Sequence, residues 1–247
     1  MKAILGIDVG GSGIKGAIVN CSSGKLLSER IRIATPNPSD PENISNTIAE
    51  VVKNLNYKGP VGVGFPAVVK QGTVYTAANI DKSFIGINYE EYLGKKLGLP
   101  VRVINDADAA GLAEIKFGAG KDVNGLVILI TIGTGIGSVL VNKGKLIPNT
   151  ELGHIFLSEN REAERYASDA VRKNENLDWI TWAGRINEYL MYLENLFWPD
   201  LFIIGGGVSK HYKEFFPYFT LRTPFVPAQL LNNAGIIGAA LAAKKLG

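Results

Sequence analysis

The feature that most constrains this sequence is a strand–turn–strand pattern that occurs twice. Residues 4–25, ILGIDVGGSGIKGAIVNCSSGK, run from an apolar segment through a glycine-rich turn into a second apolar segment and end at Gly-Lys. Residues 125–145, GLVILITIGTGIGSVLVNKGK, repeat that layout. Apolar runs separated by glycines and small polar residues are typical of antiparallel β-hairpins. The recurrence predicts a structural repeat of two α/β halves.

Further elements follow each repeated segment. A third strand is expected at about 25–33, and apolar residues at helical spacing predict a helix over 42–56. In the second half, helices dominate 158–197, and the strand LFIIG at 201–205 precedes a glycine-rich turn and a helix. The sequence therefore predicts an α/β protein and not an all-helical or all-β one.

The repeat also predicts the domain organisation. We expect residues 1–107 to form an N-terminal α/β lobe and residues 108–234 to form a C-terminal α/β lobe. The final segment, 235–247, is expected to be an apolar-faced helix that packs back on the first lobe.

Composition excludes several classes of protein. No apolar run approaches the ~20 residues of a membrane-spanning helix, and the start MKAILGIDVGG predicts a first strand and not a signal peptide. The formal net charge is +3 without a block of basic residues, which gives no support for nucleic-acid binding. Cys21 is the only cysteine, so no intrachain disulfide or multi-cysteine zinc site can form. These features predict a cytoplasmic protein with no membrane or nucleic-acid partner.

Three glycine-rich turns follow apolar strands: DVGGSG (8–13), TIGTGIG (131–137) and IIGGGVSK (203–210). Glycines let backbone amides approach an anion closely, and small hydroxyl residues add donors. None matches the P-loop pattern, and GTGIG does not lie in the βαβ unit of a dinucleotide-binding fingerprint. One such turn could simply close a hairpin, but three in one chain indicate phosphate binding.

Two polar positions leave alternatives open. His154, in NTELGHIF, could be a metal ligand, a general base, a group that grips a substrate, or a core histidine satisfied by the backbone. Asp106 follows the apolar run VRVI and could be a general base. Asn105 and Asp106 also precede a helical pattern, so either could instead be a helix N-cap.

Longer motifs resemble a known family. DVGGSGIKGAIV, TIGTGIGSVLV and GGGVSK resemble the two phosphate segments and the adenosine segment of sugar kinases with the two-lobed actin-like ATPase (ribonuclease H-like) fold, which has a cleft between its lobes. NDADAAGLAE and ELGH are similar to motifs of the ROK family (repressors, open reading frames and sugar kinases). TAANIDKSFIG, PNTELGH, WPDLFIIGGGVSK and AGIIGAA resemble the polyphosphate glucokinases within that family. The similarity extends over nearly the whole chain.

The resemblance implies roles for individual residues. Asp106 corresponds to the catalytic base that takes the proton of the sugar 6-hydroxyl. Carboxylates, amides and an imidazole suit hydroxyls, which both donate and accept hydrogen bonds. The residues implied to bind glucose are Asn79, Asn105, Glu151, His154 and Glu164. The residues implied to bind phosphate or nucleotide are Asp8, Gly10, Gly11, Ser12, Gly13, Lys15, Thr131, Gly133, Thr134, Gly135, Gly206 and Gly207.

Metal binding is implied at one position only. Asp8, at the end of the first strand, is expected to face Mg²⁺ through water, although its side chain could instead brace the loop. Lys15 could neutralise phosphate charge or be an ordinary exposed strand lysine. Most of the family has a cysteine-rich zinc motif after the histidine that matches His154, and this chain lacks it. Zinc is therefore not expected, and what orients the His154 ring is left open.

The resemblance implies a phosphotransferase that phosphorylates the 6-hydroxyl of glucose with Mg²⁺ and with inorganic polyphosphate, ATP, or both as donor. One alternative is an ATP-only hexokinase of the same family with broader sugar specificity. The other is a sugar-sensing regulator without catalysis, which is disfavoured because the first strand begins at residue 3 and leaves no room for a preceding helix-turn-helix. A homodimer is expected from the family.

Overall fold

The computed structural model describes residues 3–78 and 80–246, which divide into two compact units. Unit 1 comprises Met1–Ala113 and Asn233–Gly247, and unit 2 comprises Glu114–Asn232. The division falls inside a helix, α3 (Asp106–Phe117), and not at its first turn, where the sequence suggested a boundary between residues 107 and 108. The C-terminal segment groups with unit 1.

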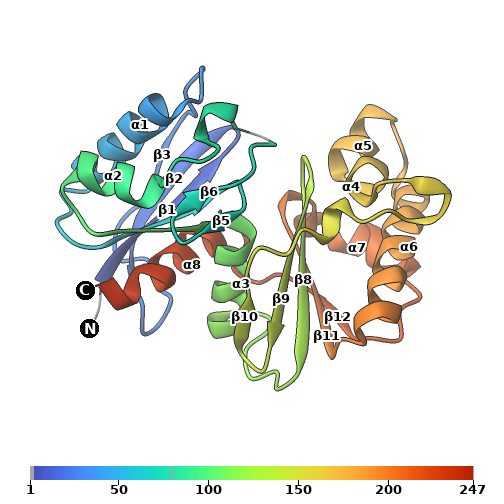
Figure 1. The fold of residues 1–247 in the computed structure, drawn as a ribbon. Helices are drawn as coiled ribbons and strands as arrows, with labels where there is room; N and C mark the ends of the chain where they lie inside the picture. The colour runs from blue at the N-terminus through green and yellow to red at the C-terminus, as the bar shows by residue number, and fades with distance from the viewer. Residues whose placement is uncertain (1–2, 79, 247) are drawn as a thin grey trace. The chain divides into compact units, whose positions relative to one another are not determined.

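Unit 1 is built on a five-stranded sheet with the order β3-β2-β1-β4-β7 (Figure 1). The first three strands are antiparallel, whereas β4 is parallel to β1 and β7 is parallel to β4. The bounds are β1 Ala3–Gly10, β2 Gly13–Asn20, β3 Ile31–Ile33, β4 Val61–Phe65 and β7 Val101–Asn105. A separate two-stranded ribbon pairs β5 (Val69–Lys70) with β6 (Thr73–Val74).

Unit 2 repeats this topology. Its sheet has the order β10-β9-β8-β11-β12, again with an antiparallel meander followed by two parallel additions. The bounds are β8 Leu126–Ile132, β9 Ile136–Asn142, β10 Lys145–Ile147, β11 Leu201–Gly205 and β12 Phe225–Pro227. The predicted repeat of two α/β halves is therefore confirmed strand by strand.

The unit 1 sheet is covered on both faces. Helix α1 (Pro41–Asn54) begins at Asp40, whose carboxylate accepts the Asn43 amide, and it buries a stripe that includes Ile44, Ile48 and Val51. It packs on one face of the sheet beside α2 (Tyr89–Leu97), and their apolar side chains join a single core with the strands. The opposite face carries α8 (Ala234–Ala242), which contacts β1 and β4 (Figure 1).

Helix α8 lies unusually close to the strands beneath it. A Cβ added at Gly6 would meet the carbonyl oxygen of Ile236, and one added at Gly62 would meet that of Ala239. Gly238 on the helix approaches the backbone of Ala109 in the same way. The glycines in LGID, VGVG and IIGAA therefore allow backbone-to-backbone packing, and the helix is buried all round where the sequence suggested only one apolar face.

Unit 2 buries one sheet face under a larger helical layer. Ile128, Ile130 and Ile204 point into a core with Trp182 and Tyr189 of α6. The helices are α4 (Ala163–Ala167), α5 (Asp169–Asn174), α6 (Trp179–Phe197) and α7 (Tyr212–Phe215). Single turns of 3₁₀ helix span 82–84, 152–154, 158–160, 207–211, 216–218, 231–233 and 243–246.

Three expectations about elements need correction. The third strand is limited to Ile31–Ile33, because Leu26 makes only an isolated bridge to Val19 and residues 27–30 join no ladder. The helical stretch from 158 is broken into short turns before α6. The glycine-rich turn after β11 leads into a 3₁₀ segment and the short α7 in place of one longer helix.

None of the helices in the described residues has the length and apolar character required to cross a lipid bilayer.

Candidate functional site

In unit 1 the carboxyl ends of the parallel strands bring the expected residues to one edge of the sheet. Asp8 lies near the end of β1 and is the register partner of Gly64 in β4, whose own partner in β7 is Ile104. Asn105 ends β7 and Asp106 begins α3. Parallel strands place their carboxyl ends together, so Asp8 and Asp106 share this edge although they are far apart in the sequence.

Asp8 and Lys15 form an ion pair across β1 and β2. They are register partners, so their side chains point to the same face, and Lys15 Nζ lies 3.3 Å from Asp8 Oδ2. The side chains are 24% and 19% exposed for Lys15 and Asp8, respectively, so both can be reached by a ligand. A partly exposed carboxylate at a strand end suits Mg²⁺, which is usually held by one or two carboxylates together with water and substrate phosphate oxygens.

The turn between β1 and β2 holds Gly10, Gly11, Ser12 and Gly13. Gly10 and Gly13 are register partners that close the hairpin, and Gly11 and Ser12 are exposed at its tip. The Thr35 hydroxyl donates to the Gly10 carbonyl oxygen, so a neighbouring segment braces the turn.

Arg32 contacts the same turn, and sequence reasoning did not find it. Its Nη2 donates to the Ser12 carbonyl oxygen at 2.8 Å, and a Cβ at Gly13 would collide with its guanidinium. Arg32 is the register partner of Lys15 across β2 and β3. Two cations therefore flank the glycine-rich turn, and the strand pairing that brings Arg32 there is not visible in a local motif.

Asn105 and Asp106 divide two tasks. The Asn105 side chain caps α3, because Oδ1 accepts the Asp108 amide at 3.0 Å while Nδ2 donates to the Ala67 carbonyl oxygen at 3.1 Å. Asp106 Oδ1 accepts the adjacent Ala107 amide at 2.8 Å, and the side chain is partly exposed. The N-cap role therefore belongs to Asn105. An amide nitrogen has two hydrogens, so this capping role is compatible with a sugar contact.

Unit 2 has its own glycine-rich turn, held by Glu164. Residues Thr131, Gly133, Thr134 and Gly135 connect β8 to β9, and Thr134 is exposed. Glu164 of α4 accepts the Ile136 amide at 2.7 Å, and a Cβ at Gly135 would collide with its carboxylate. Glu164 thus braces the phosphate-type turn as well as lying among the expected sugar ligands.

The third turn lies beside the second. Gly205 of β11 pairs with Thr131 of β8, so Gly206 and Gly207 emerge next to that turn. Gly206 has a φ of +80°, and a Cβ there would strike the backbone of Ile132, which explains its glycine structurally. Within the described part of the chain, a Cβ added at Gly207 would meet no neighbour within 4 Å, so this exposed glycine has space around it and is not required sterically.

The Glu-x-Gly-His segment is fixed against β9. The Ser138 hydroxyl donates to the Thr150 carbonyl oxygen at 2.7 Å and accepts the Leu152 amide at 2.9 Å. Gly153 packs on the carbonyl of Ile136, where no side chain would fit. The glycine of the motif is therefore a close-approach residue, and it sets the directions of Glu151 and His154 on either side.

Three of the expected sugar ligands converge in unit 2. His154 Nε2 lies 3.7 Å from Glu151 Oε2, and the pKa of each is influenced by Glu164. Burial raises the pKa of Glu151, an effect that His154 opposes and Glu164 reinforces. Glu162, which the sequence analysis missed, lies 2.6 Å from His154 Nδ1, and this hydrogen bond raises the pKa of His154 while burial opposes the rise. Asn79, the remaining expected ligand, lies outside the described residues.

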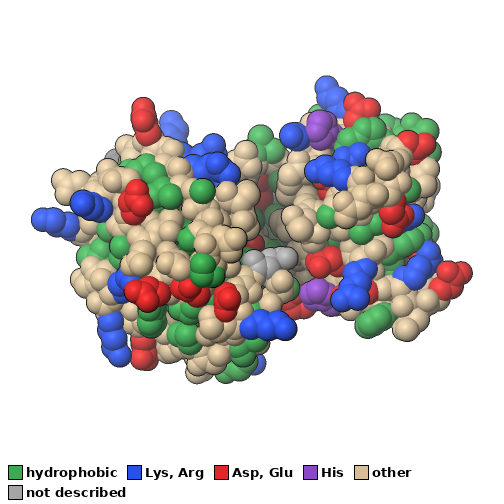
Figure 2. Space-filling view, turned by 90° about the horizontal axis from the view of Figure 1, so that it is seen from above, with side chains coloured by type: hydrophobic (Ala, Val, Ile, Leu, Met, Phe, Trp, Pro, Cys, Tyr) green, Lys and Arg blue, Asp and Glu red, His purple; other side chains and the backbone are tan. Residues whose placement is uncertain are grey.

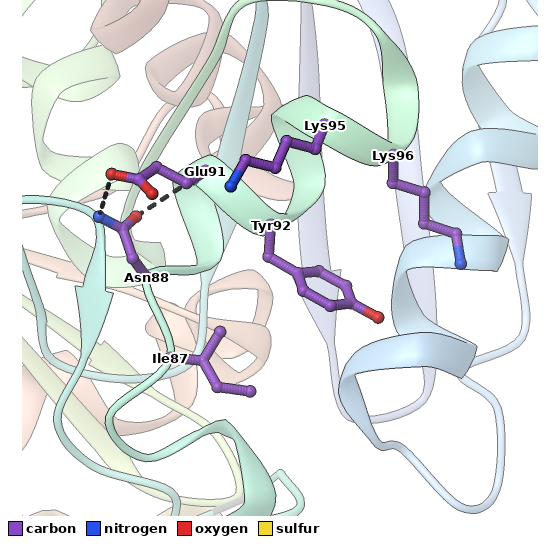
Figure 3. Close-up of a pocket in the computed structure, with 6 residues that line it drawn as sticks. All are labelled: Ile87, Asn88, Glu91, Tyr92, Lys95 and Lys96. Carbon is purple, nitrogen blue, oxygen red and sulfur yellow. Dashed lines mark hydrogen bonds between the residues drawn. The ribbon is translucent and has the colours of Figure 1, made fainter.

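A pocket of about 620 Å³ on α2 is not part of this constellation (Figure 3). Asn88 caps the helix by accepting the Glu91 amide at 3.1 Å, and its Nδ2 donates to Glu91 Oε1 at 3.2 Å. Tyr92 stacks on the buried Tyr89 with ring centroids 6.2 Å apart. The two hydrogen bonds drawn there, between Asn88 and Glu91, are explained by helix capping. None of the expected ligands that the structure describes lines the pocket.

Comparison with known proteins identifies the family. A family model described as the ROK family matches residues 4–164. A polyphosphate glucokinase of Mycobacterium tuberculosis is 50% identical over 238 residues, which cover 96% of this chain and 89% of that protein. The chain belongs to the ROK family. A glucokinase of Streptomyces coelicolor is 30% identical and is covered to 97%.

Solved structures of ROK proteins share the fold. The structure of an inorganic polyphosphate/ATP-glucomannokinase from Arthrobacter sp. strain KM superposes with a TM-score of 0.95 at 46% identity and covers 100% of both chains. A ROK family glucokinase from Streptomyces griseus, solved with glucose and AMPPNP, superposes with a TM-score of 0.81 at 28% identity, covering 99% of this chain and 100% of that one. The expected family and the two-lobed actin-like fold class are confirmed.

Proposed function

We propose that this ROK protein is a kinase that transfers a phosphoryl group to the 6-hydroxyl of glucose, with inorganic polyphosphate, ATP, or both as donor. The observation that carries the proposal is the 50% identity to a polyphosphate glucokinase over 96% of the chain. The polyphosphate/ATP-glucomannokinase structure supports the same reaction type. A regulator without catalysis is not favoured by these relatives.

The sugar half of the reaction falls to unit 2. Glu151 and His154 flank Gly153, and Glu164 lies close enough to influence the pKa of both. Carboxylates accept hydrogen bonds from hydroxyls, and they select stereochemistry because an unmet partner in the site is costly. The glucose ligands proposed in unit 2 are therefore Glu151, His154 and Glu164. The family resemblance implies Asn105 and Asn79 as further glucose ligands.

The chemical step falls to Asp106. Its carboxylate accepts the proton of the sugar 6-hydroxyl as that oxygen forms a bond to the terminal phosphorus of the donor. The bond between this phosphorus and the bridging oxygen breaks, and the remaining phosphate chain leaves with the electron pair. A positioned general base contributes about 10²–10⁴ in rate. Capping by Asn105 leaves Asp106 as the first residue of α3, at the edge of the sheet.

The donor half is proposed to use Asp8, Lys15 and the three glycine-rich turns. Asp8 would hold Mg²⁺ through water, and the ion would supply neutralisation of phosphate charge. Lys15 and Arg32 would add positive charge beside Gly10–Gly13. The face drawn in Figure 2 has acidic and basic side chains interspersed, so a polyanion would depend on such local cations. We further propose, from composition, that the protein is cytoplasmic and, from the family, that it is a homodimer. Zinc is not expected because the cysteine-rich motif of the family is lacking.

The test is an assay of glucose 6-phosphate formation with polyphosphate and ATP in parallel. Product with polyphosphate supports the proposal. If ATP gives glucose 6-phosphate and polyphosphate of every chain length gives none, the protein is instead the ATP-only hexokinase. No product with either donor, in a folded protein that still binds glucose, would favour the sugar-sensing regulator.

A further inference from the structure

Glu162 contacts the proposed sugar-binding histidine directly. Its Oε1 lies 2.6 Å from His154 Nδ1, the separation of a charge-assisted hydrogen bond. The Glu162 side chain is 18% exposed, whereas that of His154 is 44% exposed. The less accessible partner of the pair is therefore the carboxylate.

Glu162 is itself held on two sides. It forms a β-bridge with Phe156, and the Ala163 amide donates to the Ile155 carbonyl oxygen at 2.9 Å, so a short hairpin fixes its backbone. Its other oxygen, Oε2, lies 2.8 Å from Arg165 Nε. A carboxylate fixed by both backbone and side chain can fix a ring that it contacts.

The hairpin is in turn anchored to the helices around it. Arg161, which precedes Glu162, donates to Glu188 of α6 at 3.2 Å, and its guanidinium lies 4.1 Å from the ring centroid of Tyr166. Ser158 also donates to Glu188, at 2.8 Å. Partly exposed polar contacts therefore tie the hairpin that carries Glu162 to α6 and to Tyr166.

This contact determines what the two ring nitrogens can do. An ionised carboxylate only accepts, so Nδ1 of His154 must carry the proton that points to Glu162. Nε2 faces Glu151 Oε2 at 3.7 Å, which is too long for a hydrogen bond. Nε2 and Glu151 thus both retain capacity for a hydroxyl that reaches them.

We infer that Glu162 is the positioning residue for His154: it fixes the ring plane and the Nδ1–H tautomer so that Nε2 and Glu151 address the same sugar hydroxyls. The part of this inference that concerns the sugar rests on the proposed function. The part that concerns the histidine does not. It answers what orients this ring in a chain whose only cysteine is Cys21.

The charges around His154 come from three segments. Glu162 lies on the hairpin, Glu151 precedes the 3₁₀ turn, and Glu164 lies in the first turn of α4. All three favour the imidazolium form, the hydrogen bond to Glu162 most strongly, while burial opposes it. Removal of Glu162 alone should therefore lower the pKa of His154 and release its tautomer, even with the other two carboxylates in place.

The first experiment titrates the histidines of the whole protein by ¹H–¹⁵N NMR without any substrate. The chain has only two histidines, and His211, exposed beside Trp179, serves as an internal reference. In Glu162→Gln we expect the His154 pKa to fall relative to wild type. In Glu162→Ala we also expect the neutral His154 ring to populate both tautomers. An unchanged His154 titration in both variants would overturn the inference.

The second experiment separates binding from turnover. We expect Glu162→Ala to raise KM for glucose about tenfold, as for a lost hydrogen bond to a charged group, with a smaller change in kcat and in KM for the donor. Glu162→Gln keeps an acceptor for Nδ1–H and should show a smaller rise. The matched control is Glu159→Gln, which removes one charge from the same hairpin. In the described part of the chain the ion pair of Glu159 is with Arg161 and not with His154.

Two outcomes would count against the inference. If Glu159→Gln altered the His154 pKa and glucose KM as much as Glu162→Gln, the effect would be the general charge of the hairpin and not the contact. If Glu162→Ala left glucose KM at the wild-type value although His154 titrated differently, His154 would not act on the sugar. If the protein phosphorylated no glucose but its variants showed the expected changes in the His154 titration, the proposed function would be wrong. The inference that Glu162 orients His154 would still stand.

Discussion

The two units share one sheet topology but differ in what lies on their central strands. In unit 1, Gly6 of β1 and Gly62 of β4 are register partners, and α8 rests on their backbone. The central pair of unit 2 instead consists of large aliphatic residues such as Ile130 and Ile204, both fully buried under α6. Unit 1 also has a side-chain core on the other face of its sheet, where the register partners Ile7 and Val63 are buried. The same strand order thus supports a backbone contact in unit 1 in addition to the kind of side-chain core that both units have.

The chemistry is distributed just as unevenly. In unit 1 the proposed reactive residues belong to the sheet or adjoin it directly. Asp8 and Lys15 lie in β1 and β2, and Asp106 follows the last residue of β7. Unit 2 places a long segment between β10 and α6, and that segment carries Glu151, His154 and the hairpin with Glu162. Under the proposed function, the general base and the carboxylate for Mg²⁺ belong to unit 1, whereas three of the five proposed sugar ligands and two of the three glycine-rich turns belong to unit 2. The predictions below test this division.

The largest expected effect is at Asp106. We expect Asp106→Asn to lower kcat by about 10²–10⁴, because a general base is lost while the side chain keeps its shape. The Kd for glucose, measured by calorimetry, should stay within a few-fold of the wild-type value if the residues of unit 2 make most of the glucose contacts. A kcat near the wild-type value would remove Asp106 from the mechanism. Loss of glucose binding would contradict the assignment of glucose binding mainly to unit 2.

The next effect is on stability and tests the glycine contact of unit 1. We expect Gly62→Ala to lower the free energy of unfolding by about 3 kcal/mol, since the new Cβ meets the backbone of α8 and not a flexible side chain. Gly184→Ala in α6 is the matched control, because no atom lies within 4 Å of its added Cβ. That change should stabilise by up to about 1 kcal/mol. Urea unfolding of both variants checks this difference in stability. Equal urea concentrations at the unfolding midpoints of the two variants would refute the prediction.

A third prediction probes the sugar side. His154→Ala should weaken glucose binding by ~1–3 kcal/mol, because the hydroxyl that His154 meets is left unpaired. The KM for polyphosphate or ATP should change less, since those ligands are assigned to the glycine-rich turns. Elemental analysis of the purified wild-type protein should find no stoichiometric zinc. One zinc ion per chain would mean that a metal and not Glu162 orients the ring.

Much of this arrangement was predictable from the sequence, because repeated strand–turn–strand patterns and glycine runs are local signals. The duplicated sheets follow from them. The Glu-x-Gly-His motif singled out Glu151 and His154, whose side chains lie 3.7 Å apart in the structure. Glu162 was not predictable, since only the pairing of the hairpin, with Phe156 opposite Glu162, brings its carboxylate back to His154.

Two other features depended on pairing that the sequence does not reveal. Arg32 reaches the first glycine-rich turn only through the register of β2 with β3, and the expected longer third strand would not have identified it. The bond from the Ile136 amide to Glu164 joins an expected phosphate turn to an expected sugar ligand. Such contacts between segments are set by tertiary packing, which local patterns do not specify.

A smaller effect concerns the donor. A long polyphosphate can touch several cations at once, whereas ATP is expected to rely mainly on the turns and Mg²⁺. Because exposed charges are screened over ~8–10 Å at moderate salt, added salt should raise KM for long polyphosphate more steeply than KM for ATP. Arg32→Ala should raise the polyphosphate KM by a few-fold, and Lys96→Ala on α2 is the control of equal charge. If KM rose equally steeply with salt for both donors, this would argue against polyphosphate binding by several cations of unit 1 at once.

The smallest expected effect is a pH dependence of stability that belongs to unit 2. In the folded protein the hydrogen bond to Glu162 raises the pKa of His154, while burial opposes the rise. The resulting stabilisation is complete below the unfolded pKa of about 6.5 and is lost as the pH rises through the folded value. Wild type should therefore exceed Glu162→Gln in free energy of unfolding most clearly below about pH 6.5, and the gap should narrow at higher pH. The pair is exposed enough for salt to reduce the gap as well. Urea unfolding across the pH range checks this, and a gap that widened with rising pH would show that Glu162 stabilises the fold through a contact other than the protonated ring.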